Sequence, residues 1–109
     1  MGDVVRVPFP FVERTRLRAR PALIVSGPVG PDGALLWSLM ITSARRGRWP
    51  GDIAIGGDHA RYGLPVPCFI RTAKIAALEA SAIERRLGQL PADLSDEVKR
   101  EIRDALGWR

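Results

Sequence analysis

The side chains best suited to act on a substrate are an arginine and two hydroxyls at the ends of apolar runs. Arg20 opens a run over residues 21–26, and Thr42 and Ser43 close a run over residues 34–41. Such groups can promote RNA cleavage, because RNA supplies its own 2′-hydroxyl nucleophile and the catalyst needs only to align it and stabilise phosphate charge. The residue types alone still favour a plainer interpretation, in which Arg20 and Thr42 are ordinary residues at strand ends.

Most other catalytic arrangements are absent from the sequence. The chain has one histidine, His59, and one cysteine, Cys68, which are too few for a zinc site or an intrachain disulfide. It shows no paired carboxylates at a useful spacing, no Gly-x-Ser-x-Gly elbow and no Walker loop. We therefore predict no metal and no cofactor. Cys68 is predicted to be a buried apolar residue, and His59 a surface loop residue with RNA contact as the weaker alternative.

Positive charge is concentrated in the first two-thirds of the chain. The net charge is +5, but residues 1–74 carry eleven Lys or Arg against five acids, whereas residues 75–109 carry six against seven. Fifteen of the seventeen basic residues are arginine, whose planar fork suits phosphates and base edges. This pattern predicts a polyanionic partner such as single-stranded RNA, although a merely soluble arginine-rich surface would give the same totals.

The predicted RNA contacts lie in two arginine-rich loops. The first loop, over residues 13–19, carries Arg14, Arg16 and Arg18, and the second carries Ser43, Arg45, Arg46, Arg48 and Trp49. Trp49 is the better candidate for stacking on an unpaired base, an interaction worth about 1–3 kcal/mol. Trp37 lies inside an apolar run and is predicted to belong to the core instead.

Short strands must position these groups. Apolar and β-branched patterns predict strands over residues 4–11, 21–26, 34–42 and 51–55 and within 66–75, with a hairpin loop over 28–33. Prolines confine the first strand to an edge or a bulge. Residues 80–90 fit a helix or a strand equally well.

The end of the chain predicts one amphipathic helix. After Pro91, apolar residues recur at spacings of three and four until Gly107 ends the pattern. We therefore predict a mainly β fold with a C-terminal α-helix, as a small barrel or strongly bent sheet, in a single domain over residues 1–109. A domain this small would gain stability as a dimer. With no apolar run of about 18 residues and no secretory signal, we expect a cytoplasmic protein without a membrane partner.

Several motifs resemble the MazF/PemK family of toxins. Gly2-Asp3 before an apolar strand, and Arg20-Pro21-Ala22 before an apolar run that ends at Ser26, are similar to the signature of that family. The resemblance continues through residues 41–43, 51–53, 63–64 and 70–75, so it covers nearly the whole chain.

The resemblance implies a fold and an activity. It implies an SH3-like barrel of the MazF/CcdB/PemK type, a homodimer and a metal-independent endoribonuclease that leaves a 2′,3′-cyclic phosphate and a 5′-hydroxyl. Arg20 matches the catalytic arginine of the family and Thr42 the threonine that steadies the scissile phosphate, while Arg71 falls in the strand that lines the dimer groove and becomes a further RNA contact. An acidic, partly disordered cognate antitoxin is also implied.

Two features depart from the family pattern, and two other functions stay open. The first loop is arginine-rich, and Ala44 stands where some relatives carry glutamine, so the base preference does not follow from the resemblance. The alternatives are a gyrase poison of the CcdB type, against which Arg20 and Thr42 argue, and a non-catalytic SH3-like module that binds RNA or protein.

Overall fold

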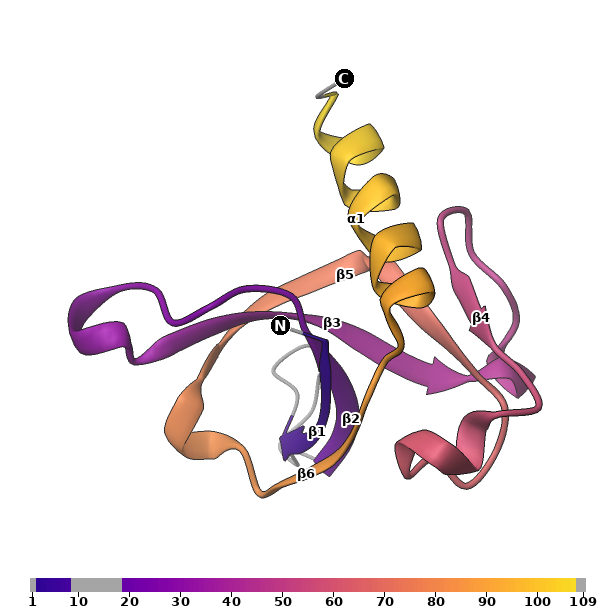
Figure 1. Ribbon diagram of the computed structural model, residues 1–109, viewed down its shortest axis with the longest axis horizontal. Helices are drawn as coiled ribbons and strands as arrows, with labels where there is room; N and C mark the ends of the chain where they lie inside the picture. The colour runs from indigo at the N-terminus through magenta and orange to yellow at the C-terminus, as the bar shows by residue number, and fades with distance from the viewer. Residues whose placement is uncertain (1, 9–18, 108–109) are drawn as a thin grey trace.

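Six strands form one antiparallel sheet, and helix α1 follows the last strand (Figure 1). The computed structural model describes residues 2–8 and 19–107, so the predicted loop with Arg14, Arg16 and Arg18 lies outside the described residues. The spatial order is β4-β5-β3-β2-β1-β6. The strands are β1 (Asp3–Pro8), β2 (Ala19–Ile24), β3 (Leu35–Ser43), β4 (Ile53–Ile55), β5 (Cys68–Glu79) and β6 (Arg85–Gln89).

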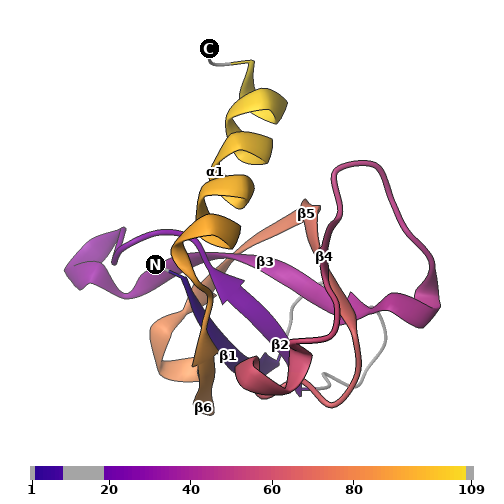
Figure 2. The ribbon, with the colours of Figure 1, turned by 45° about the vertical axis from the view of Figure 1, so that its right-hand side comes forward.

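Two interruptions in the pairing bend the sheet. Between β3 and β5 the register passes from Leu39–Ile75 to Met40–Arg71, so residues 72–74 of β5 are extra. A second shift separates Val4 from Val5 where β1 pairs with β6. Bulges of this kind bend a strand and increase its twist. Figures 1 and 2 show the resulting curled sheet, with α1 rising from the end of β6, which confirms the predicted mainly β fold with a C-terminal helix.

The alternation of apolar residues serves two hydrophobic clusters, one on each face of the sheet. Val4 and Leu23 belong to the larger cluster, whereas Val5 and Ala22, the next residue on each strand, belong to the smaller one. Because successive side chains on a strand point to opposite faces, β1 and β2 contribute to both clusters.

Helix α1 (Ala92–Leu106) covers the larger cluster. Val98 is fully buried in it, and Leu94 and Ile102 pack against it one turn away on either side. The helix ends at Gly107, whose φ of 77° is the left-handed conformation that glycine adopts readily. These boundaries confirm the predicted helix. No helix in the described part of the chain has the length and apolarity needed to cross a membrane.

The structure decides the ambiguous stretch over residues 80–90 and corrects the prediction for Trp37. The ambiguous stretch over 80–90 forms a short 3₁₀ turn, η4 (Ala80–Ala82), followed by strand β6. Trp37 was predicted to be core, but it is 51% exposed and the prediction is wrong. The chain still follows β3 beyond Ile24, since the Val25 backbone N–H donates to the Trp37 carbonyl oxygen at 2.9 Å. The Trp37 side chain instead borders an open surface hollow that Ile75, Ala76 and Ala77 also line.

Candidate active site

Arg20 and Thr42, the two residues predicted to be catalytic, line the same surface hollow. The β2–β3 ladder ends at the pair Ala22–Met40, and Arg20 and Thr42 each lie two residues beyond this pair on their strands. The hollow has a volume of about 220 Å³. Its other lining residues are Arg6, Pro21, Ile41, Ser43, Arg46, Leu64, Pro65, Val66 and Cys68. Three arginines, Arg6, Arg20 and Arg46, thus line a small cavity that could receive a phosphate group.

Thr42 contributes a buried hydroxyl to this hollow. The residue is only 3% exposed, and Oγ1 has no hydrogen-bond partner among residues 2–8 and 19–107. A buried hydroxyl without a partner destabilises a fold by about 1–3 kcal/mol, so such groups call for a functional explanation. A phosphate oxygen placed in the hollow would accept a hydrogen bond from Oγ1.

Ser43 starts the second basic loop. Its Oγ accepts a hydrogen bond from the backbone N–H of Arg45 at 3.2 Å and so caps the 3₁₀ turn η2 (Ala44–Arg46). Arg46 reaches the hollow, whereas the exposed Arg45 is not among its lining residues. The structure therefore brings Ser43 and Arg46 beside the two predicted catalytic residues and places Arg45 outside the hollow.

A buried ion pair anchors the rest of this loop. Arg71 Nη2 lies 2.8 Å from Asp52 Oδ2, and the two side chains are 5% and 0% exposed. Arg71 also donates to the Gly47 carbonyl oxygen at 2.7 Å, while Asp52 Oδ2 accepts from the Trp49 backbone N–H at 2.8 Å. Arg71 was predicted to contact RNA, but its guanidinium is committed to this network, so its observed role is structural.

Trp49 lies on top of this network and stays partly accessible. Its ring is 4.0 Å from the Arg71 guanidinium carbon, and the residue is 39% exposed. Arg48 is exposed, donates to the Asp52 carbonyl oxygen at 2.9 Å and lies 5.4 Å from the Phe69 ring. These contacts hold Trp49 and Arg48 at the surface of the protein.

His59 and Cys68 have structural roles. His59 Nδ1 lies 2.7 Å from the Leu64 carbonyl oxygen, a hydrogen bond that closes the turn η3 (His59–Tyr62). Cys68 is 4% exposed, as predicted, and burial raises the pKa of its thiol. A raised pKa keeps the thiol protonated, which makes Cys68 a poor nucleophile although it borders the hollow.

Arg6 is a site residue that the sequence patterns did not single out. It lines the hollow from β1, and its Nε lies 3.5 Å from Glu84 Oε1 in a half-exposed ion pair. Only its position beside the Arg20 strand could have indicated it, because Arg6 pairs with Pro21 across the β1–β2 ladder.

The sequence of the chain matches the model of a known protein family. Residues 1–106 match the model of the PemK-like, MazF-like toxin of type II toxin-antitoxin systems. The chain belongs to this toxin family. A comparison with curated protein sequences gave no match for this MazF-like toxin.

Solved structures share the fold of the MazF-like chain at low identity. The Mycobacterium tuberculosis toxin MazF-mt6 is 18% identical, with a TM-score of 0.75 over 98% of both chains. A mycobacterial endoribonuclease in complex with its cognate antitoxin is 18% identical, with a TM-score of 0.68 over 99% of this chain and 92% of the other. MazF in a MazE–MazF crystal of Deinococcus radiodurans is 22% identical, with a TM-score of 0.70 over 99% and 95%. The MazF architecture is therefore preserved along the chain.

Proposed function

We propose that this toxin is a metal-independent endoribonuclease that cuts single-stranded RNA, with messenger RNA in the cytoplasm as the preferred substrate class. The observation that carries the proposal is the shared hollow, which is lined both by Arg20 and by the buried hydroxyl of Thr42, a group with no partner in the described residues. Family membership supports the toxin role, and two structural neighbours are themselves named endoribonucleases.

The reaction uses the 2′-hydroxyl of the substrate. Its oxygen gives up a proton to solvent water and forms a bond to the adjacent phosphorus. The bond from phosphorus to the 5′-oxygen breaks at the same time, and this oxygen takes up a proton from water, which leaves a 2′,3′-cyclic phosphate and a 5′-hydroxyl. Arg20 stabilises the negative charge that grows on the phosphate, and Thr42 donates a hydrogen bond to one of its oxygens. A guanidinium with a pKa above about 12 stays protonated, so Arg20 acts through charge in this scheme.

RNA approaches over the basic loop. Arg46 extends the positive rim of the hollow, Arg48 and Arg45 stand exposed beside it, and Trp49 offers a ring face for an unpaired base. Arg14, Arg16 and Arg18 are proposed to add to this surface from the first loop.

A homodimer and an acidic antitoxin complete the proposed function. The solved relatives include an endoribonuclease with its cognate antitoxin and a MazE–MazF complex, which supports an antitoxin as partner. An acidic tail would compete with RNA for the same arginines. Sedimentation of the purified toxin tests the dimer, and inhibition of cleavage by an acidic protein encoded next to the toxin gene tests the antitoxin.

The decisive experiment incubates the purified protein with single-stranded RNA in EDTA. We expect cutting, 2′,3′-cyclic phosphate ends and no cutting of an oligonucleotide with 2′-deoxyribose at the cleaved position. Arg20→Ala should lower the cleavage rate by about 10²–10³-fold, the effect typical of losing one transition-state contact. Arg85→Ala is the matched control, since this exposed arginine lies outside the hollow.

Other outcomes would reject the assignment. Inhibition of gyrase without RNA cleavage would identify a poison of the CcdB type. RNA binding without cleavage, weakened by Arg20→Ala, would identify a binding module.

A further inference from the structure

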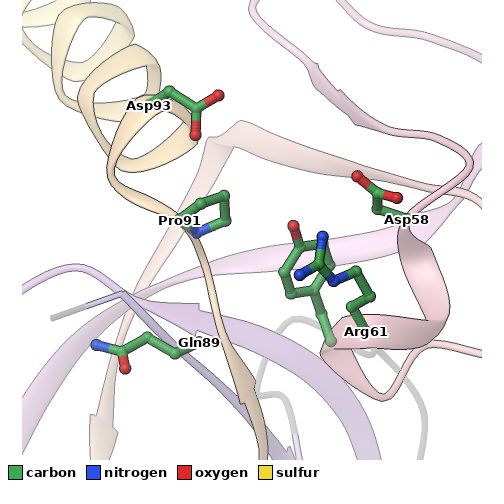
Figure 3. A pocket seen from close by; sticks show the side chains of 6 residues that line it. Asp58, Arg61, Gln89, Pro91 and Asp93 are labelled. Atoms are coloured by element: carbon green, nitrogen blue, oxygen red, sulfur yellow. The ribbon is translucent and has the colours of Figure 1, made fainter.

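A second pocket lies between turn η3 and the junction of β6 with α1 (Figure 3). Its volume is about 440 Å³, and it shares no lining residue with the hollow of Arg20 and Thr42. The lining residues are Asp58, Arg61, Tyr62, Gln89, Pro91 and Asp93. A volume in the range of about 300–1,000 Å³ suits a small planar ligand.

Two glycines hold the walls of this pocket at a fixed spacing. A Cβ atom on Gly63, whose φ is +72°, would lie 2.8 Å from the Leu87 Cβ, and one on Gly88 would lie 2.9 Å from the Tyr62 Cα. The backbones of η3 and β6 therefore touch where a side chain would force them apart. The pocket is preformed and needs no closure to bind a ligand.

Opposite charges face this pocket without pairing. Asp58 and Arg61 come from the η3 side and Asp93 from α1, and none of the three side chains forms an ion pair or hydrogen bond with any described residue. Gln89 Oε1 is already engaged, because it accepts a hydrogen bond from Arg86 Nη2 at 3.0 Å, which leaves the Gln89 amine as a donor. Two acceptors, one cationic donor and one neutral donor are thus available.

Tyr62 adds a further donor at the wall of the pocket. The residue is 6% exposed and lines the pocket, and its hydroxyl has no hydrogen-bond partner in the described part of the chain. The hydroxyl oxygen is not among the buried unpartnered atoms of these residues, so the ring is packed while the hydroxyl reaches the pocket surface. A ligand in the pocket can replace water as the partner of this hydroxyl.

We infer that this pocket binds an unpaired guanine base. Ionised carboxylates only accept hydrogen bonds and a guanidinium only donates them, so the ligand must offer donors on one edge and acceptors on another. Guanine has two neighbouring donors, N1–H and the N2 amine, for an aspartate, and O6 with N7 accepts from arginine. The other RNA bases offer fewer donors.

The base can come from the RNA substrate or from a free guanine nucleotide. The first source rests on the proposed function and would make the pocket a determinant of sequence preference. The second source does not depend on cleavage, so binding of a mononucleotide and cutting of RNA can fail separately.

Calorimetry with nucleoside 5′-monophosphates tests the inference. GMP should bind at least about tenfold more tightly than AMP, CMP, UMP or IMP, since IMP lacks the N2 amine and a bidentate contact contributes about 1–3 kcal/mol. Tyr62→Phe and Asp93→Asn should each weaken GMP binding by about fivefold or more, the effect of one hydrogen bond of about 1 kcal/mol. Asp96→Asn, on the same helix but outside the pocket, should leave it unchanged.

The RNA arm compares cleavage of oligonucleotides in which guanines near the cut are replaced one at a time by inosine. If inosine at one position prevents cutting, and Asp93→Asn removes this dependence on guanine, then the pocket binds a guanine of the RNA substrate. If GMP binds but cutting shows no dependence on guanine, then the pocket binds the free nucleotide. Equal binding of all four nucleotides or of ribose 5-phosphate, or GMP binding unaffected by Tyr62→Phe and Asp93→Asn, would overturn the inference. Normal cleavage without GMP binding or a guanine preference would reject it while leaving the proposed function intact.

Discussion

The Arg71 guanidinium and the Asp52 carboxylate form a two-pronged ion pair, at 2.8 and 3.2 Å, in a place that solvent scarcely reaches. The pair joins strand β5 to the basic loop before β4, and Trp49 covers it. Desolvating two charges is expensive, so such a pair contributes chiefly by defining one loop conformation. Here that conformation presents Arg48 and Trp49 to the outside.

Removing one member of the pair should destabilise the fold strongly. Asp52→Asn leaves the Arg71 charge buried without a counter-ion, and we expect a loss of about 3–5 kcal/mol in the free energy of unfolding, measured by urea denaturation. Asp3→Asn is the control, because Asp3 pairs with Arg86 in the exposed ion pair and should lose no more than about 1 kcal/mol. Equal losses of unfolding free energy in the two variants would show that the buried ion pair contributes no more to stability than the exposed one.

Thr42→Val should separate stability from activity. Valine has nearly the shape of threonine, so removal of the unpartnered hydroxyl should preserve stability or raise it by about 1 kcal/mol while RNA cleavage falls by about 10²-fold. Thr72→Val is the matched control, since that hydroxyl donates to the Gly51 carbonyl oxygen at 2.9 Å. The control should lose about 1 kcal/mol of stability and keep its cleavage rate. An active Thr42→Val protein would remove Thr42 from the mechanism.

Trp49 and Trp37 should differ in their effect on RNA binding. Both are exposed, but only Trp49 belongs to the basic loop. Trp49→Ala should weaken binding of single-stranded RNA by about 5- to 150-fold, which corresponds to about 1–3 kcal/mol of stacking. Fluorescence anisotropy at fixed salt with an Arg20→Ala background, which prevents cleavage, measures the change. Trp37→Ala should bind as before, and a similar loss in both variants would contradict the stacking role.

Cys68 should make stability fall at high pH. Burial raises the thiol pKa in the folded state above its ordinary value of 9.0, so the folded state retains a proton that the unfolded chain releases. The stability contributed by this difference is complete below pH 9 and is lost as pH rises through the folded pKa. Urea midpoints from pH 7 to 10 should decline more steeply for the natural chain than for Cys68→Ala, and parallel curves would exclude a titrating Cys68.

Local pattern predicted much of this molecule because its strands and helix follow simple periods. The alternation in β1 and β2 and the spacing of Leu94, Val98 and Ile102 identify these elements from short segments. The meeting of Arg20 and Thr42 was also within reach, since both lie at the ends of strands that pair as neighbours.

Contacts and exposures that depend on tertiary packing could not be predicted from the sequence. The partner of Arg71 lies nineteen residues away in a loop, and no local rule connects the two. The exposure of Trp37 depends on the open hollow that it shares with Ile75 and Ala77 of β5, and the second pocket depends on the close approach of η3 and β6 that Gly63 and Gly88 allow.

The three extra residues of β5 make this strand sensitive to its own length. Ile70 belongs to the larger apolar cluster, while Ala76 and Leu78 belong to the smaller one on the opposite face, although all three positions are even-numbered. A strand without the interruption would turn all even positions to one side. Deleting one residue from 72–74 would therefore turn the side chains of half the strand to the opposite face of the sheet. Insertions and deletions in related chains are expected to be rare at residues 72–74 and more frequent in the loops.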